Sequence, residues 1–205
     1  MSYSITRCLR HSALVAALAA VRTATAQAPA QQAQAADVHF MQGMIGHHAQ
    51  AIVMAGLAAG RTQRDDMKML AERIDVAQRD EIATMSQWLA AHGQTVPKPD
   101  AHAMAGHDMP DMPGMAHDSM PMMPGMATPA QMDSLRAARG AAFDRLFLTY
   151  MIRHHEGALT MVAQLFASKG AAQEPAVFQL ASDVDTDQRA EIARMRALLA
   201  ALPNR

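Results

Sequence analysis

Residues 37–54 read DVHFMQGMIGHHAQAIVM, and residues 144–161 read DRLFLTYMIRHHEGALTM. Asp, Phe, Met-Ile, His-His and Met recur in the two stretches at one constant offset. Each stretch is followed by a second matching element, Gln-x-x-Glu-Ile-x-x-Met, at residues 78–85 and 188–195. A repeat of this length indicates two copies of one supersecondary unit. Its polar residues recur in matched sets, which indicates a functional site as well as a scaffold.

The apolar residues of both copies follow the period of a helix, and no segment alternates as a strand would. Four helices are predicted, over residues 36–59, 63–91, 128–168 and 174–202. Each copy would form a hairpin with one apolar stripe, over residues 36–93 and 128–202, and two such hairpins should dock on each other. The sequence therefore predicts an all-α fold, an antiparallel four-helix bundle built from two repeated helical hairpins.

Two of these helices carry a recognisable start signal. Thr62 followed by Asp65 resembles a capping box. Thr128 and Pro129 followed by Gln131 resemble a second one, with proline in the first turn. We therefore expect the second and third helices to begin at these threonines.

The amino-terminal residues 1–26 have the three parts of a secretory signal peptide. A positively charged start precedes a short apolar run, and Ala24-Thr25-Ala26 forms an A-x-A cleavage site. The apolar run is too short to cross a bilayer, which takes about 20 residues, so no stable membrane insertion is expected after cleavage. The sequence predicts a periplasmic or secreted protein.

The composition of the chain restricts the partners and the kinds of metal site that it can have. The net charge is −1, and no basic stripe with interleaved aromatic residues suggests a nucleic-acid partner. The single cysteine, Cys8, lies in the signal segment, so the mature chain would have no thiol. Disulfides and thiolate metal sites are then excluded, and a soft metal ion would have to bind methionine sulfur and imidazole.

Two segments have the composition of linkers. Residues 27–35 are a low-complexity, flexible lead-in, and residues 94–127 are rich in Met, His and Pro. The linker is either a disordered spacer or a flexible set of soft-metal ligands that would add binding capacity. Its candidate accessory ligands are His102, His107, His117, Met104, Met109, Met112, Met115, Met120, Met123 and Met126.

The histidine pairs are predicted to face the interior. At 100° per residue, the two imidazoles of each pair lie on either side of the apolar stripe, one turn after a methionine. The candidate metal ligands with this placement are Met44, His47, His48, Met151, His154 and His155. Glu81 and Glu191 fall within the apolar stripe of the neighbouring helices, where an ionised carboxylate is costly unless it is paired or bound to a cation. Further accessory candidates on inward faces are Asp37, Asp144, Met85 and Met195.

Two interpretations of this set stay open. Thioether ligands select soft ions such as Cu(I), and imidazole accepts Cu(I), Cu(II) or zinc. Glu81 and Glu191 would be either direct ligands or hydrogen-bond acceptors that orient a ligating histidine. The alternative is a polar Glu–His layer that fixes helix register, with methionine as filler.

The doubled Met-x-x-His-His-x-x-Ala motif followed by Gln-x-x-Glu-Ile resembles the secreted bacterial family known as domain of unknown function 305. The resemblance covers residues 36–202, with the linker as an insertion that the family motif does not explain. It implies a ferritin-like four-helix bundle, and some members are copper-binding proteins linked to copper tolerance. By this resemblance, the Met and His-His positions of the two motifs would be the metal ligands.

The favoured function is therefore an extracytoplasmic copper-binding protein without a catalytic step, which sequesters or shuttles copper, Cu(I) in preference to Cu(II). A shuttle would also need a copper-transport partner, which no motif identifies. A ferritin-like di-metal oxidase is the first alternative, but the Glu-x-x-His motif of such sites is missing. A metal-free structural or partner-binding bundle is the second alternative.

Overall fold

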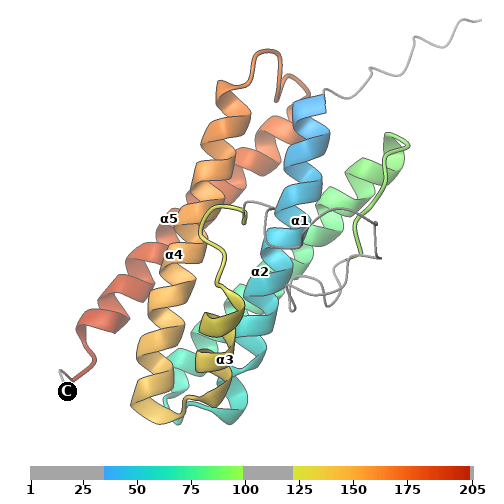
Figure 1. Cartoon of the computed structure of the whole chain (residues 1–205). Helices are drawn as coiled ribbons and strands as arrows, with labels where there is room; N and C mark the ends of the chain where they lie inside the picture. The colour runs from blue at the N-terminus through green and yellow to red at the C-terminus, as the bar shows by residue number, and fades with distance from the viewer. Residues whose placement is uncertain (1–34, 99–121, 204–205) are drawn as a thin grey trace, which may run out of the picture. The chain divides into compact units, whose positions relative to one another are not determined.

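The structure, a computed structural model, describes residues 35–98 and 122–203. Its elements are α1 (Ala35–Gly56), the short 3₁₀ helix η1 (Ala58–Gly60), α2 (Asp65–Ala91), α3 (Pro129–Ala137), α4 (Gly140–Ala167) and α5 (Pro175–Ala200) (Figure 1). These two described ranges contain helices and no strand, so the all-α prediction is confirmed.

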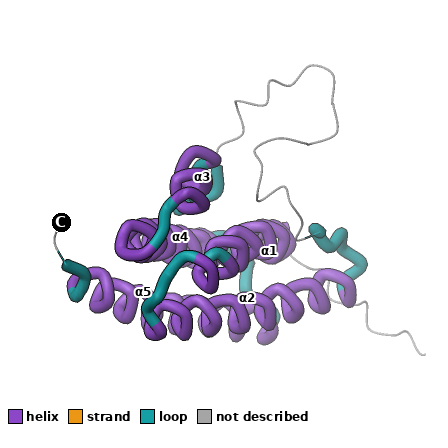
Figure 2. The backbone as a smooth tube through the Cα atoms, turned by 90° about the horizontal axis from the view of Figure 1, so that it is seen from below, coloured by secondary structure: helices purple, strands orange, loops and turns teal. Residues whose placement is uncertain are grey.

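The four long helices pack in a defined order. α1 packs on α2, α4 packs on α5, and α1 and α4 contact each other. The Asp37 carboxylate at the start of α1 accepts a hydrogen bond of 2.7 Å from the amide of Ala172, just after α4. The carbonyl of Arg61, just after α1, accepts one of 2.7 Å from the amide of Gly140, where α4 begins. α1 and α4 therefore run in opposite directions. Figure 2 shows α1 and α4 between α3 on one side and α2 and α5 on the other.

The apolar core is divided into two clusters. One contains Ala51, Met151 and Met195, and the other contains Met44 and Met85. In each repeat the histidine pair lies between a residue of one cluster and a residue of the other. The histidines thus form a buried polar layer between the two apolar clusters.

The third predicted helix is two helices in the structure, and the single-helix prediction is wrong. α3 ends at Ala137, the next two residues are extended, and α4 begins at Gly140. Gly140 has a φ of +56°, which glycine adopts at little cost. Its amide is the donor to Arg61, so the break lets the start of α4 meet the end of α1.

One predicted capping box is confirmed and the other is wrong. The Thr128 side chain accepts from the amide of Gln131, whose side chain accepts from the Thr128 amide. α2 instead begins after Arg64, without a side-chain cap. Thr62 accepts a hydrogen bond from the Arg64 amide at 3.1 Å, so it orders the turn that precedes the helix. The first helix also ends earlier than predicted, at Gly56, and η1 occupies the remainder.

The last residues of the linker are packed against the helices. We call residues 122–128 the strap. The Gln50 amide donates to the carbonyl of Ala127 at 2.9 Å and accepts from its amide at 2.7 Å. Gly125, with a φ of +77°, lies directly on Gly157 of α4, where a side chain on either glycine would overlap the backbone of the other segment. The strap is therefore fixed to both α1 and α4.

Some predictions concern residues outside the described ranges. These are the signal peptide (1–26), the lead-in up to residue 34, and the linker ligands His102, Met104, His107, Met109, Met112, Met115, His117 and Met120. Among the helices of the described ranges, none has the length and apolar character needed to span a bilayer.

Candidate metal centre

All four histidines of the two motifs are buried, with 0% of their surface exposed. His48 lies 2.5 Å from Glu81, and His155 lies 2.6 Å from Glu191, in each case between Nε2 and Oε2. The carboxylates retain slight solvent access, with side-chain exposures of 16% and 12%. Each glutamate thus joins the buried layer to the surface. In this geometry it accepts a hydrogen bond and orients the imidazole, the arrangement common around ligating histidines.

The other histidine of each pair meets its counterpart at the centre. The rings of His47 and His154 are in contact, tilted by 36° to each other at a centroid distance of 3.8 Å. His47 Nε2 donates to the carbonyl oxygen of Pro124 at 2.9 Å. His154 Nε2 donates to the carbonyl oxygen of His47 at 3.0 Å. The central pair is therefore held by main-chain oxygens, one of them from the strap.

These hydrogen bonds determine which ring nitrogen carries the proton. A carbonyl or carboxylate oxygen only accepts, so Nε2 is protonated in all four rings. The four Nδ1 atoms are buried and have no hydrogen-bond partner among the described residues. A buried polar atom without a partner costs about 1–3 kcal/mol. An imidazole nitrogen that carries no proton is the atom that binds a metal ion.

Burial keeps the central pair neutral. Loss of solvent, together with the nearby His48 and His155 rings, lowers the pKa of His47 to about 3, against the opposing effect of the Pro124 carbonyl. Burial also lowers the pKa of His154 well below its usual value, and the neighbouring His47 ring adds to the effect. A cation approaching these rings would not have to displace a proton at neutral pH.

Two pairs of thioethers lie next to the histidine layer. α1 and α2 are antiparallel, and His48 contacts Glu81, so one turn away Met44 comes to face Met85. Both methionines are fully buried in the same apolar cluster. Met151 and Met195 repeat this arrangement beside His155 and Glu191, in the other cluster. Met85 and Met195, which the sequence indicated only as accessory candidates, thus occupy positions equivalent to those of Met44 and Met151.

The candidate donors do not converge on a single point. Within one repeat, the ring centroids of His47 and His48 are 6.4 Å apart, and those of His154 and His155 are 6.2 Å apart. In the described part of the chain, no three His, Cys, Asp or Glu side chains are grouped closely enough to hold a metal ion. A site with three side-chain ligands in this geometry would have to include a residue of another kind, and methionine sulfur is the nearest candidate by sequence.

The two inward aspartates have different surroundings. Asp37 is buried at the start of α1, where its bond to the Ala172 amide holds the turn between α4 and α5. Ten helical residues separate Asp37 from His47, a rise of about 15 Å. Asp144 is also buried, and its Oδ1 has no hydrogen-bond partner among the described residues. The structure thus assigns Asp37 a role in the fold and places both aspartates at the two ends of the helical core.

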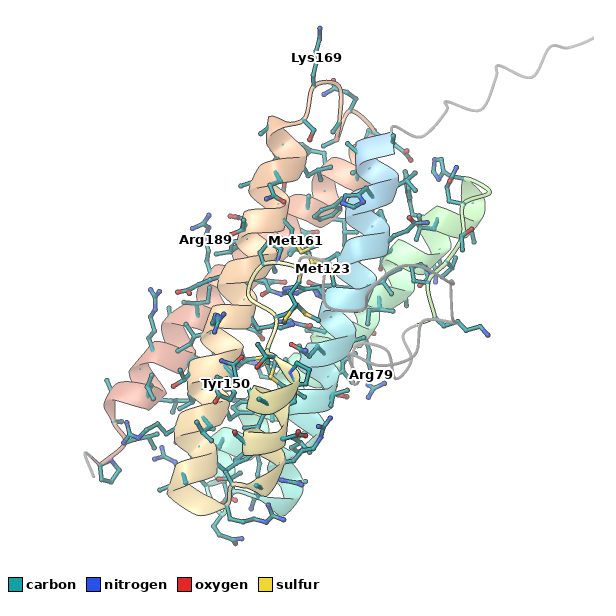
Figure 3. All side chains as sticks on the ribbon, in the orientation of Figure 1. Arg79, Met123, Tyr150, Met161, Lys169 and Arg189 are labelled. Atoms are coloured by element: carbon teal, nitrogen blue, oxygen red, sulfur yellow. The ribbon has the colours of Figure 1, made fainter. Side chains whose placement is uncertain are left out.

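One linker methionine, Met123, lies near Met161 of α4, which is half-buried against the apolar core. A side chain on Gly43 would lie 3.8 Å from the sulfur of Met123 and 3.3 Å from the terminal methyl of Met161. Figure 3 shows Met123 and Met161 close together where the strap crosses α1 and α4. Met126 is also described and lies in the strap, where its amide donates to the Met123 carbonyl.

The contribution of Pro124 could not be read from the sequence. It acts through its carbonyl oxygen, and every residue has one. The indirect signals are Gly125 and Gly157, which permit the close approach of the strap to α4. Neither glycine stands out in the sequence without knowledge of that contact.

Known proteins share the sequence pattern of these helices. The family model described as a domain of unknown function (DUF305) matches residues 37–199, which is most of the chain. The protein belongs to the DUF305 family. The family resemblance inferred from the doubled motif is thereby confirmed. A search of curated proteins finds no match.

Several solved structures are similar to this DUF305 protein. A DUF305 fragment from Deinococcus radiodurans is 31% identical, with a TM-score of 0.66 over 83% of this chain and 99% of the other. A DUF305 protein from Streptomyces coelicolor, named as a secreted protein, is 28% identical, with a TM-score of 0.65 over 80% and 92% of the two chains. CopM in its Cu(II)-bound form is 29% identical, with a TM-score of 0.59 over 80% and 95%. CopM has also been solved with Cu(I) and with Ag bound.

Proposed function

We propose that this DUF305 protein binds copper outside the cytoplasm, and that it sequesters or shuttles the ion without a catalytic step. The observation that carries the proposal is the set of four buried imidazoles, each with Nε2 fixed by an oxygen and with Nδ1 unpartnered within residues 35–98 and 122–203. The resemblance to CopM, which has been solved with Cu(I), Cu(II) and Ag bound, supports the same metal class.

We assign the ligands by repeat. In the first repeat they are Met44, Met85 and Nδ1 of His48, with Glu81 as the residue that orients the ring. Met151, Met195, His155 and Glu191 are their counterparts. Two thioethers and one imidazole favour Cu(I), because soft sulfur ligands select it over harder divalent ions. The rings of His47 and His154 lie 6.4 Å and 6.2 Å from those of His48 and His155, centroid to centroid, and would replace them as ligands when the ion moves.

The remaining parts of the proposal have indirect support. An extracytoplasmic location fits the signal-like residues 1–26 and the secreted family protein from Streptomyces coelicolor. The helix contacts favour the antiparallel, ferritin-like four-helix bundle expected from the repeat. The linker methionines outside the described ranges would add capacity for the same soft ion.

The test distinguishes the loss of sulfur ligands from a general disturbance of the fold. Met44→Leu/Met151→Leu removes two thioethers with little change in volume, a kind of exchange that costs under about 1.5 kcal/mol. We expect it to weaken Cu(I) and Ag(I) binding at least about tenfold, and X-ray absorption should show fewer sulfur neighbours. The matched control is Met67→Leu/Met132→Leu, which alters two equally buried methionines of the apolar core. Undiminished affinity in the first variant, or a metal shell of nitrogen and oxygen only, contradicts the proposal.

A di-metal oxidase has less support from this geometry. Such sites use clustered carboxylates, whereas Glu81 and Glu191 each bind a histidine. Glu156, the carboxylate beside His155 in the sequence, is ion-paired with Arg196 at 2.6 Å on the surface. Oxygen consumption by an iron-loaded sample would support the oxidase instead.

A further inference from the structure

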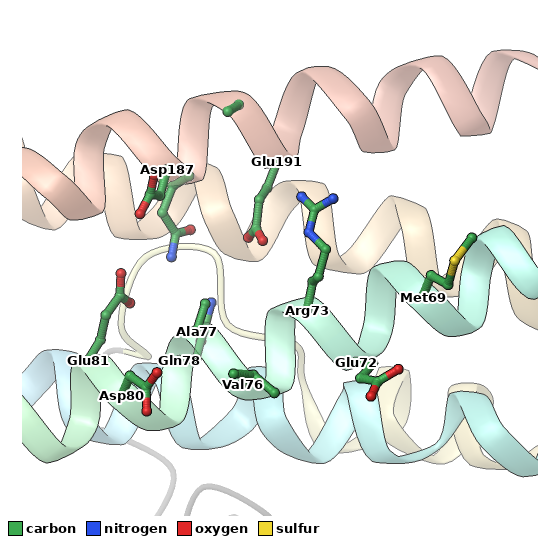
Figure 4. A pocket seen from close by; sticks show the side chains of 12 residues that line it. Met69, Glu72, Arg73, Val76, Ala77, Gln78, Asp80, Glu81, Asp187 and Glu191 are labelled. Atoms are coloured by element: carbon green, nitrogen blue, oxygen red, sulfur yellow. The ribbon is translucent and has the colours of Figure 1, made fainter.

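A groove runs along the surface between α2 and α5, on the side of the histidine layer away from the strap. It has a volume of about 700 Å³. Figure 4 shows it from close by, with Gln78 and Glu81 on α2 facing Asp187 and Glu191 on α5, and with Asp80 at the outer rim. α2 and α5 leave this space because each packs mainly on its own hairpin partner.

The charge of the groove is strongly one-sided. Its lining contains one basic residue, Arg73, and five acidic residues, Glu72, Asp80, Glu81, Asp187 and Glu191. The whole chain carries a net charge of only −1, so the negative charge is concentrated here. The carboxylates also act on one another across the groove, because partial burial and the charges of Glu81 and Glu191 raise the pKa of Asp187. A groove lined by one sign of charge concentrates ions of the opposite sign.

Two buried amides face the same groove. Gln78 and Gln188 line it, although they are only 1% and 2% exposed. Both amide atoms of Gln78, and the Oε1 of Gln188, have no hydrogen-bond partner among the described residues. Buried polar atoms without partners are rare. The two carbonyl-type oxygens, one from each helix, are therefore available to a cation at the base of the groove.

The groove reaches the histidine layer through two residues. Glu81 and Glu191 line it, and the same carboxylates hydrogen-bond to the fully buried His48 and His155. Only one carboxylate thus separates the groove from each imidazole. The groove around Ala55, on α1 and α2, is lined by neither of these two glutamates.

We infer that this acidic groove is the route by which the soft metal cation enters and leaves the buried site. The outer carboxylates attract the ion, and the amide oxygens of Gln78 and Gln188 replace part of its water. The ion then passes Glu81 or Glu191 and the ring edge that this carboxylate holds, and reaches Nδ1 on the other side of the adjacent imidazole. This inference rests on the proposed metal binding at the histidine layer. To that proposal it adds the path of the ion and the groove residues along it that are not metal ligands.

The first test changes the charge of the groove and leaves the ligands intact. Asp80→Asn/Asp187→Asn should slow the association of Ag(I), measured by stopped-flow fluorescence of Trp88, the single tryptophan. At low ionic strength we expect a decrease of about tenfold, within the range of electrostatic steering. The dissociation rate should fall as well, so the equilibrium constant from calorimetry changes less than the rates. Asp65→Asn/Asp133→Asn is the control, because it makes the same change in charge at exposed residues outside the groove.

The second test fills the groove. Ala77, which lines the groove, is changed to Trp, and Ala83→Trp on an exposed face of the same helix serves as its control. Only Ala77→Trp should slow uptake and release. Wild-type rates in both groove variants, or equal slowing in the controls, would overturn the route. A wild-type protein that binds no Ag(I) or Cu(I) would instead refute the proposed function itself.

Discussion

Gly157 offers the sharpest test of how the strap is seated. A side-chain carbon at this position would overlap the carbonyl group of Pro124 and lie 2.8 Å from the Cα of Gly125. All of these neighbours are backbone atoms, which cannot rotate away as a flexible side chain could. Gly157→Ala should therefore lift the strap from α4 and α1.

The magnitude follows from the hydrogen bonds that the strap supplies. His47 would lose its acceptor, and a buried donor without a partner costs about 1–3 kcal/mol. The two bonds between Gln50 and Ala127 contribute about 1 kcal/mol each. Alanine favours the helix over glycine by up to about 1 kcal/mol, which offsets part of the loss. We expect the free energy of unfolding to fall by about 2–4 kcal/mol.

Urea unfolding followed by circular dichroism measures this change. With a slope of about 2 kcal/mol per molar urea, the midpoint should fall by about 1–2 M. Gly56→Ala is the matched control, because a side chain there meets nothing within 4 Å, and it should leave the midpoint unchanged or raise it slightly. If Gly157→Ala unfolds at the same urea concentration as Gly56→Ala, the strap does not lie on α4 as described.

Three further predictions concern the same core. The pKa of His47 is lowered to about 3, and that of His154 lies well below 6.5. Below pH 6.5 the unfolded chain therefore binds more protons than the folded protein. The free energy of unfolding should decrease from pH 6.5 toward pH 3 and stay level above pH 6.5. Each ring should contribute about 1.4 kcal/mol per pH unit, and urea titrations of His47→Asn should show a shallower slope. Gln50→Leu should lower the free energy of unfolding by about 2 kcal/mol and speed hydrogen exchange at the Ala127 amide, which loses its buried acceptor. Unchanged exchange would contradict the hydrogen bonds between Gln50 and the strap. Ala172→Gly should raise the free energy of unfolding by about 1 kcal/mol, because Ala172 has a φ of +52°, and a lower midpoint would refute that reasoning.

The sequence was sufficient to predict most helices and the inward direction of the histidine pairs. Both depend on the local period of 3.6 residues, which any segment carries by itself. It was not sufficient to predict the break before Gly140. A single glycine within a helical pattern is often tolerated, and here the bond to the Arg61 carbonyl favours the break. That partner belongs to the other repeat, so local patterns contain no information about it.

The role of the glutamates shows the same division. The sequence placed Glu81 and Glu191 on inward faces but left two possibilities, ligand or orienting acceptor. The register of α2 on α1, and of α5 on α4, brings each glutamate to the Nε2 of a histidine and turns Nδ1 away from it. Register depends on how whole helices pack, because side chains of many residues interlock at once.

By itself, the sequence determined that this chain is a duplicated helical protein of the DUF305 family with histidines and methionines on buried faces. Periodicity and repetition are properties of the chain alone. Only the tertiary structure decided that Met44 and Met85 lie buried in one apolar cluster, that a carbonyl of the strap orients His47, and that an acidic groove reaches the histidines. These features join atoms from segments far apart in the chain, and their distances exist only once the helices have docked.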